Sequence, residues 1–277
     1  MDQKRTITRV LTALGLGAFM NSGAAAQTPA VQIFAAGSLR GVVNDLAAQA
    51  GTALGIEVKS SFGGSGSMRE RIEKGEPADL LMSADLGSPQ KLEARGRTVV
   101  PTIAFARNRM CIVSRKADGM TAANLIDRLL APGVRVKSST PIVDPSGDYA
   151  WSIYKRIEAL RPGVEGVLEK KWEATSKLVA KPATPTQSAA AALFATHAID
   201  MSITYCSGTA ALEREVPDLT SLVVPPNLDP HPVYGVAVLS ARPEVLRLAL
   251  FVLSEKGQAI IAKEGLVPLT EPSGSAQ

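Results

Sequence analysis

Residues that carry metal and redox chemistry are scarce in this sequence. Its 277 residues include two cysteines, Cys111 and Cys206, and two histidines, His197 and His231. The wide spacing of the cysteines excludes a CxxC motif for zinc or haem and a disulfide-framework miniprotein. Two histidines also leave little room for a histidine-rich metal site, so we expect no cofactor.

Aromatic residues and clustered positive charge are scarce as well. Phe, Trp and Tyr make up 4% of the chain, and the formal charge of +4 is spread over a sequence with no run of five Lys or Arg residues. We therefore expect no nucleic-acid partner, since both base stacking and a basic patch are missing. The hydrophobic content of 45% is that of a globular protein and excludes general disorder.

Long hydrophobic runs are absent, and the apolar run near the N-terminus is short. Basic residues up to Arg9 precede ten mostly apolar residues at 10–19, and three alanines follow at 24–26. A membrane-spanning helix needs about 20 such residues, so the pattern predicts a cleavable signal peptide over residues 1–26. We expect an exported, periplasmic protein in an oxidising compartment, where the two cysteines either pair or stay as buried free thiols.

Strand-like and helix-like segments alternate along the rest of the chain. The first series predicts strands at 31–36, 56–62 and 80–83, each followed by a helix, at 39–50, 68–74 and 88–95. A second series predicts strands at 110–114, 134–136, 142–143, 177–180 and 199–205, with helices at 122–130, 149–160, 188–196 and 207–213. This alternation indicates an α/β fold with mainly parallel sheets covered by helices. Two lobes fit the count: residues 27–105 and the returning segment 232–277 would form the first, and 106–231 the second.

Small and hydroxyl residues gather where these strands end. They occur at 35–38, 63–67, 144–149, 184–188 and 205–207. Each loop opens a helix, so it offers unpaired backbone N–H groups, a hydroxyl and the positive end of a helix dipole. Any one of them is readily explained as a helix cap, but ligands bind at this edge of α/β sheets. Together the loops indicate a site for an anion held by dipoles and not by a counter-ion.

Four segments resemble the periplasmic molybdate-binding proteins, the substrate receptors of ABC importers. They read FAAGSL at 34–39, SFGGSGS at 61–67, IEKGEPADLLMSAD at 72–85 and ITY at 203–205. The similarity is strong through Asp85 and looser beyond it. It implies two α/β lobes joined by hinge strands, which close on a tetrahedral oxyanion in the cleft between them.

The resemblance also implies a ligand set and a partner. It implies a receptor, not an enzyme, that works as a monomer with a membrane permease and binds molybdate or tungstate, the metal being held through its oxygen atoms. Ser38 and Ser65 would donate hydrogen bonds from the first lobe and Tyr205 from the second. Second-lobe backbone N–H groups would add to them, at Ala150, Trp151 and Gln187. Molybdate only accepts hydrogen bonds, so six or seven fixed donors would offset the cost of burying it.

Asp148 departs from the family's pattern, because a carboxylate beside a dianion would repel it. As a helix N-cap pointing away from the ligand it would do no harm, whereas facing the cleft it would favour a protonated oxyanion. Another oxyanion or a small organic anion therefore stays open as the ligand. A secreted enzyme on the same scaffold also stays open, with Asp148 as its acid or base. A serine hydrolase is disfavoured, since GGSGS at 63–67 lacks the last glycine of a nucleophile elbow.

Overall fold

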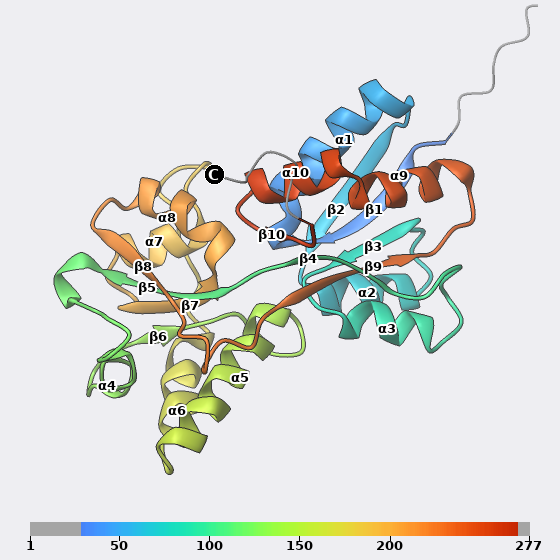
Figure 1. Cartoon of the computed structure of the whole chain (residues 1–277). Coiled ribbons are helices and arrows are strands. Elements are labelled where there is room, and N and C mark those ends of the chain that lie inside the picture. The colour runs from blue at the N-terminus through green and yellow to red at the C-terminus, as the bar shows by residue number, and fades with distance from the viewer. Residues whose placement is uncertain (1–28, 271–277) are drawn as a thin grey trace, which may run out of the picture.

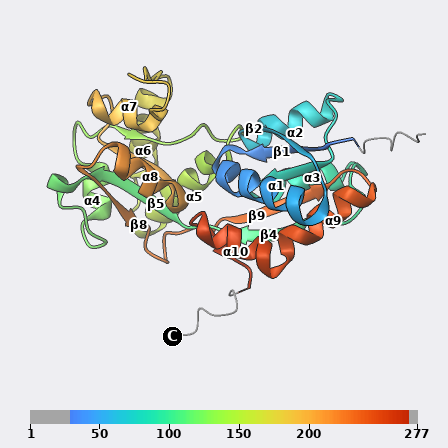
Figure 2. The ribbon, with the colours of Figure 1, turned by 90° about the horizontal axis from the view of Figure 1, so that it is seen from above.

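The protein has two lobes, each built on its own β-sheet (Figure 1). The structure is a computed structural model that describes residues 29–270; the predicted signal peptide at 1–26 lies outside them. Figure 2 shows the lobes side by side. Two extended segments join them: the chain leaves the first lobe at Asn108 and Arg109 and returns through residues 224–232 (Figure 1).

Six strands form the sheet of the first lobe, in the order β10-β4-β9-β3-β1-β2. Their bounds are β1 Val31–Ala36, β2 Val58–Gly63, β3 Leu80–Ser83, β4 Ile103–Arg107, β9 Val233–Val238 and β10 Val267–Pro268. Helices cover both faces: α1 (Arg40–Leu54), α9 (Pro243–Leu253) and α10 (Glu255–Lys263) lie on one, and α2 (Ser65–Glu73) and α3 (Gly87–Glu93) on the other (Figure 1). Strand β3 is buried along its whole length, as expected of an inner strand covered on both faces.

Four strands form the sheet of the second lobe, in the order β6-β7-β5-β8. Their bounds are β5 Met110–Arg115, β6 Val136–Lys137, β7 Met201–Tyr205 and β8 Leu219–Val223. Five helices surround them: α4 (Leu125–Leu130), α5 (Pro145–Leu160), α6 (Glu165–Ser176), α7 (Ala189–Ala195) and α8 (Thr209–Glu215). Helix α5 buries Ile153, Tyr154 and Ile157, whose spacing of three and four residues places them on one helical face.

Both sheets are mixed, which corrects the prediction that they are mainly parallel. Strand β1 pairs in parallel with β2 and β3, but β9 runs antiparallel to β3 and β4. In the second lobe β5 is antiparallel to both of its neighbours. The physical reason is the connection between the lobes. Strand β4 leads out of the first lobe and β9 leads back into it, so the two run in opposite directions when they pair.

Several local predictions for the second lobe differ from the structure. The predicted strands at 142–143 and 177–180 do not form; Ile142 lies in a turn with a φ of 72°. Helix α5 begins at Pro145 and not at 149, because Asp144 caps it by accepting the Ser146 backbone N–H at 3.0 Å. Helix α6 and strands β4 and β8 were not predicted at all.

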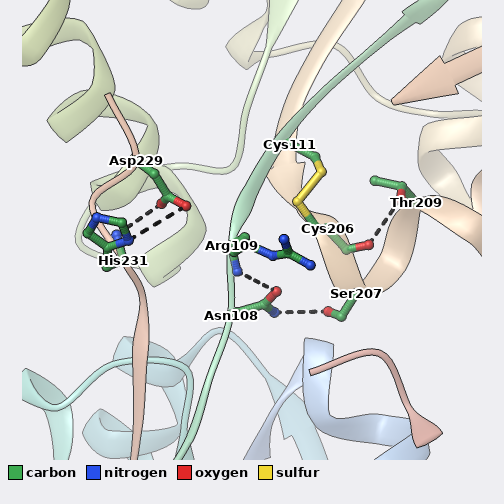
Figure 3. The surroundings of a disulfide bond; sticks show 8 residues. All are labelled: Asn108, Arg109, Cys111, Cys206, Ser207, Thr209, Asp229 and His231. Carbon is green, nitrogen blue, oxygen red and sulfur yellow. Dashed lines mark hydrogen bonds and ion pairs between the residues drawn. A yellow bond between two sulfur atoms is a disulfide. The ribbon is translucent and has the colours of Figure 1, made fainter. Parts of the chain in front are cut away.

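A disulfide joins Cys111 to Cys206 and decides between the two states that the sequence left open. Cys111 lies in β5, and Cys206 directly follows β7, the antiparallel neighbour of β5 (Figure 3). The bond therefore fixes the loop after Tyr205 to the strand that enters the second lobe. Within residues 29–270, no helix is both long and apolar enough to cross a membrane.

Candidate functional site

A cavity of about 390 Å³ lies where loops of both lobes meet. Its lining is dominated by glycine and hydroxyl residues and contains no Lys or Arg. The first lobe contributes Ala36, Gly37, Ser38, Gly63, Gly64 and Glu264, and the second contributes Ser139, Asp144, Ser146, Thr204, Tyr205, Ser207 and Gly208.

The register of two parallel strands brings the first-lobe loops together. Ala36 at the end of β1 is paired with Gly63 at the end of β2, so both loops emerge at the same sheet edge. Helices α1 and α2 begin within four residues of these strand ends. Their N-terminal backbone N–H groups and dipoles therefore converge on the cavity, as the sequence pattern predicted.

Ser38 lines the cavity, whereas Ser65 lies behind it. The Ser38 hydroxyl is 3.1 Å from the Tyr234 hydroxyl. Ser65 is fully buried, and its Oγ accepts the Ala84 backbone N–H at 3.0 Å. The hydroxyl of Ser65 thus ties α2 to the end of β3, while its neighbours Gly63 and Gly64 form the cavity wall.

Tyr205 reaches the cavity from the end of β7. Its side chain is buried, and its hydroxyl donates to the Ala84 carbonyl oxygen at 3.5 Å, across the gap between the lobes. The Tyr234 ring packs against it with a centroid separation of 5.6 Å. Burial raises the pKa of Tyr205 well above its ordinary value, so the phenol keeps its proton and remains a donor.

The structure does not bring Ala150, Trp151 and Gln187 to the cavity. Because α5 begins at Pro145, Ala150 and Trp151 lie in its second turn, beyond the N–H groups that a helix leaves unpaired. Trp151 packs edge to face on Trp172 in a separate hollow. In the loop before α7, the Gln187 side chain accepts the Ala183 backbone N–H at 2.6 Å.

Asp148 also lies outside the cavity, and it is not the helix N-cap. It belongs to the first turn of α5, and its Oδ1 accepts the Ile142 backbone N–H at 2.8 Å. Burial raises the pKa of Asp148. Its carboxylate holds the turn at Ile142 in its positive-φ conformation, which β-branched residues rarely adopt.

Three further serines, Ser139, Ser146 and Ser207, line the cavity, although the sequence analysis did not single them out. Ser146 is the second residue of α5, and Ser207 directly follows the cysteine after β7. Both belong to loops whose composition had indicated a site. The signal that could have identified them is their place immediately after a strand end or a helix cap.

Two carboxylates, Asp144 and Glu264, also line the cavity. One oxygen of Asp144 caps α5. Glu264 packs over Gly41 in the first turn of α1, where a Cβ would overlap its carboxylate. An anion in this cavity therefore experiences two negative charges beside its donors. Within residues 29–270, His, Cys, Asp and Glu side chains form no group of three that could hold a metal ion.

The lobes contact each other directly next to the cavity. A Cβ added to Gly64 would overlap the carbonyl oxygen of Val143, and one added to Gly66 would overlap that of Ile142. These two glycines thus allow the first-lobe turn to lie against the backbone of the 142–143 turn.

Residues 31–267 match the family described as bacterial extracellular solute-binding protein. The chain belongs to this family. An uncharacterised protein of Pasteurella multocida is 32% identical over 195 residues, which cover 70% of this chain and 79% of the relative. The molybdate-binding protein ModA of Azotobacter vinelandii is 31% identical over 112 residues, 40% of this chain and 43% of ModA, so the match spans less than half of ModA.

Solved structures show the same two-lobed fold. The periplasmic molybdate-binding protein of Azotobacter vinelandii superposes with a TM-score of 0.68 at 20% identity, covering 87% of this chain and all of that one. The sulfate-binding protein SubI of Mycobacterium tuberculosis gives a TM-score of 0.67 at 19% identity, with coverage of 87% and 88%. The chain thus has the two-lobed fold of these binding proteins, in agreement with its membership of the solute-binding family.

Proposed function

We propose that this protein is the periplasmic receptor of an ABC importer and that it binds molybdate or tungstate. The observation that carries the proposal is the cavity between the lobes, in which hydroxyls of both lobes meet the N-termini of α1 and α2 without any Lys or Arg in the lining. Such uncharged donors suit a fully ionised oxyanion, which only accepts hydrogen bonds. The similarity to ModA supports molybdate in particular.

In this proposal the ligand is held by a subset of the residues expected from the sequence. Ser38 donates its hydroxyl proton, and Tyr205 donates its own once the ligand replaces the Ala84 carbonyl oxygen as its acceptor. The residues at the starts of α1 and α2 donate backbone N–H groups. Ser207 and Ser146 take the place expected for Ala150, Trp151 and Gln187. The closed lobes then dock on a membrane permease after export by the signal peptide.

Asp144 and Glu264 favour a second candidate, an oxyanion that carries a proton. A carboxylate can accept a hydrogen bond from hydrogen phosphate or from a phosphorylated organic acid, but it only repels molybdate. Both candidate ligands occupy the same cavity. They differ in whether the ligand has a proton that Asp144 and Glu264 can accept.

Isothermal titration of the purified protein with molybdate, tungstate, sulfate and phosphate tests the proposal. We expect submicromolar binding of molybdate and tungstate, lost in a Ser38→Ala/Ser207→Ala double variant. Ser114→Ala is the matched control, because Ser114 is fully buried in β5, away from the cavity, and its hydroxyl has no hydrogen-bond partner within residues 29–270. Binding of phosphate alone would support the second candidate. No measurable binding of any of the four anions would refute the oxyanion site.

A further inference from the structure

A pair of buried polar side chains lies beside the cavity, one on a segment that joins the lobes and one just after the other segment. Asn108 lies between β4 and β5 with 3% of its surface exposed, and Tyr234 lies fully buried in β9. The Asn108 Nδ2 atom is 3.1 Å from the Tyr234 hydroxyl. Neither residue lines the cavity, but each contacts a serine that does: Asn108 contacts Ser207 and Tyr234 contacts Ser38.

The hydrogen bonds of Asn108 determine which of its neighbours accept. Its Oδ1 accepts the Arg109 backbone N–H at 2.9 Å, which identifies the other side of the amide as the nitrogen. That nitrogen has two protons. One is donated to Ser207 Oγ at 2.9 Å, as Figure 3 shows, and the other to the Tyr234 hydroxyl. Ser207 and Tyr234 are therefore both acceptors toward Asn108.

The proton of the Tyr234 hydroxyl then needs an acceptor. Burial raises the pKa of this phenol, so it stays protonated. Its remaining hydroxyl neighbours are Ser38 and Tyr205, and of these contacts the one to Ser38, at 3.1 Å, is within hydrogen-bond distance among the described residues. Tyr234 thus donates to Ser38 Oγ. A serine hydroxyl has a single proton. Ser38 accepts from Tyr234 and Ser207 accepts from Asn108, so each serine keeps its own proton for another partner.

We propose that Asn108 and Tyr234 are positioning residues that turn the hydroxyl protons of Ser38 and Ser207 into the cavity, one from each lobe. Each serine thereby presents its proton to the ligand, which suits an unprotonated ligand oxygen at that position. This inference rests on the proposed oxyanion site and adds to it the residues that fix the direction of its hydrogen bonds. Because Asn108 and Tyr234 contact each other, the pair also links the first-lobe donor Ser38 to the second-lobe donor Ser207.

A double-mutant cycle with molybdate as the probe tests this role. Tyr234→Phe removes only the hydroxyl, and we expect it to weaken molybdate binding about 5- to 10-fold in the wild-type background. In a Ser38→Ala background the same change is expected to have no further effect, because the hydroxyl acts through Ser38. Tyr154→Phe is the control: Tyr154 is as deeply buried, in α5, and does not line the cavity.

A second cycle keeps the test informative if Tyr234→Phe destabilises the protein. Asn108→Leu and Ser207→Ala should likewise be non-additive in molybdate affinity, while thermal melting reports folding separately. Equal losses from Tyr234→Phe in both backgrounds would show that the Tyr234 hydroxyl acts independently of Ser38, which overturns the inference and leaves the oxyanion site intact. If the wild-type protein binds no oxyanion, the proposed function fails, and this inference fails with it.

Discussion

The contact between the lobes predicts that small substitutions at Gly64 will impair ligand binding. A Cβ at this position overlaps the carbonyl oxygen of Val143, and backbone atoms cannot move aside as a flexible side chain can. Overpacking of this kind costs about 1–3 kcal/mol. The two residues belong to different lobes, so the cost applies only while the lobes are closed. We therefore expect Gly64→Ala to weaken molybdate binding about 5- to 150-fold.

The assay combines titration calorimetry with thermal melting and small-angle scattering. Without ligand, Gly64→Ala should melt close to the wild-type temperature, and with ligand it should stay more extended than the wild type. Gly66→Ala should behave alike, since its Cβ overlaps the carbonyl oxygen of Ile142. Gly166→Ala in α6 is the control, because a Cβ there meets nothing within 4 Å. Unchanged affinity in Gly64→Ala, or an equal loss of stability without ligand, would refute the reasoning.

Three further predictions concern charge, redox state and pH. Glu264→Gln removes a negative charge from the cavity wall and should strengthen binding of a dianion by about 1 kcal/mol, or fivefold; weaker molybdate binding by calorimetry would contradict this. Replacing Cys111 and Cys206 by serine opens a loop of 95 residues and should lower the free energy of unfolding by about 4–5 kcal/mol in urea titrations; a loss below 1 kcal/mol would count against it. Burial raises the pKa of Asp148 above its unfolded value, so its contribution to stability is present at low pH and lost as pH rises through the folded pKa. Asp148→Asn should therefore raise the melting temperature at pH 7 more than at pH 3. An equal shift of the melting temperature at both pH values would argue against this account.

The first lobe could be predicted from local sequence because its site depends on short-range signals. The strands β1, β2 and β3 and the helices after them follow the predicted order, with boundaries within four residues. Ser38 follows β1 within two residues, so placing the strand also placed the serine at the sheet edge. Ser65 was placed equally well in sequence, but its hydroxyl bonds to Ala84, a contact that depends on the packing of β3 against α2.

The second-lobe part of the site could not be predicted in the same way. The residues that reach the cavity depend on where α5 begins. Asp144 as the cap and Pro145 as the first residue place that start four residues ahead of the predicted helix. The shift places Ala150 and Trp151 inside the helix and brings Ser146 to the cavity. A helical period determines a face but not a first residue, so the cap and not the pattern decides which groups remain free to bind a ligand.

The contact between Asn108 and Tyr234 could not be predicted from any local sequence pattern. Asn108 and Tyr234 are 126 positions apart, and each is unremarkable in its own stretch of sequence. They meet because β4 leads out of the first lobe and β9 leads back beside it, and this antiparallel pairing is the feature that the prediction of parallel sheets missed. The same pairing places one hydrogen-bond donor next to Ser38 and another next to Ser207. The topology that joins the two lobes therefore also orients their hydroxyls, so changes at Asn108 and Tyr234 should alter ligand affinity and lobe closure together.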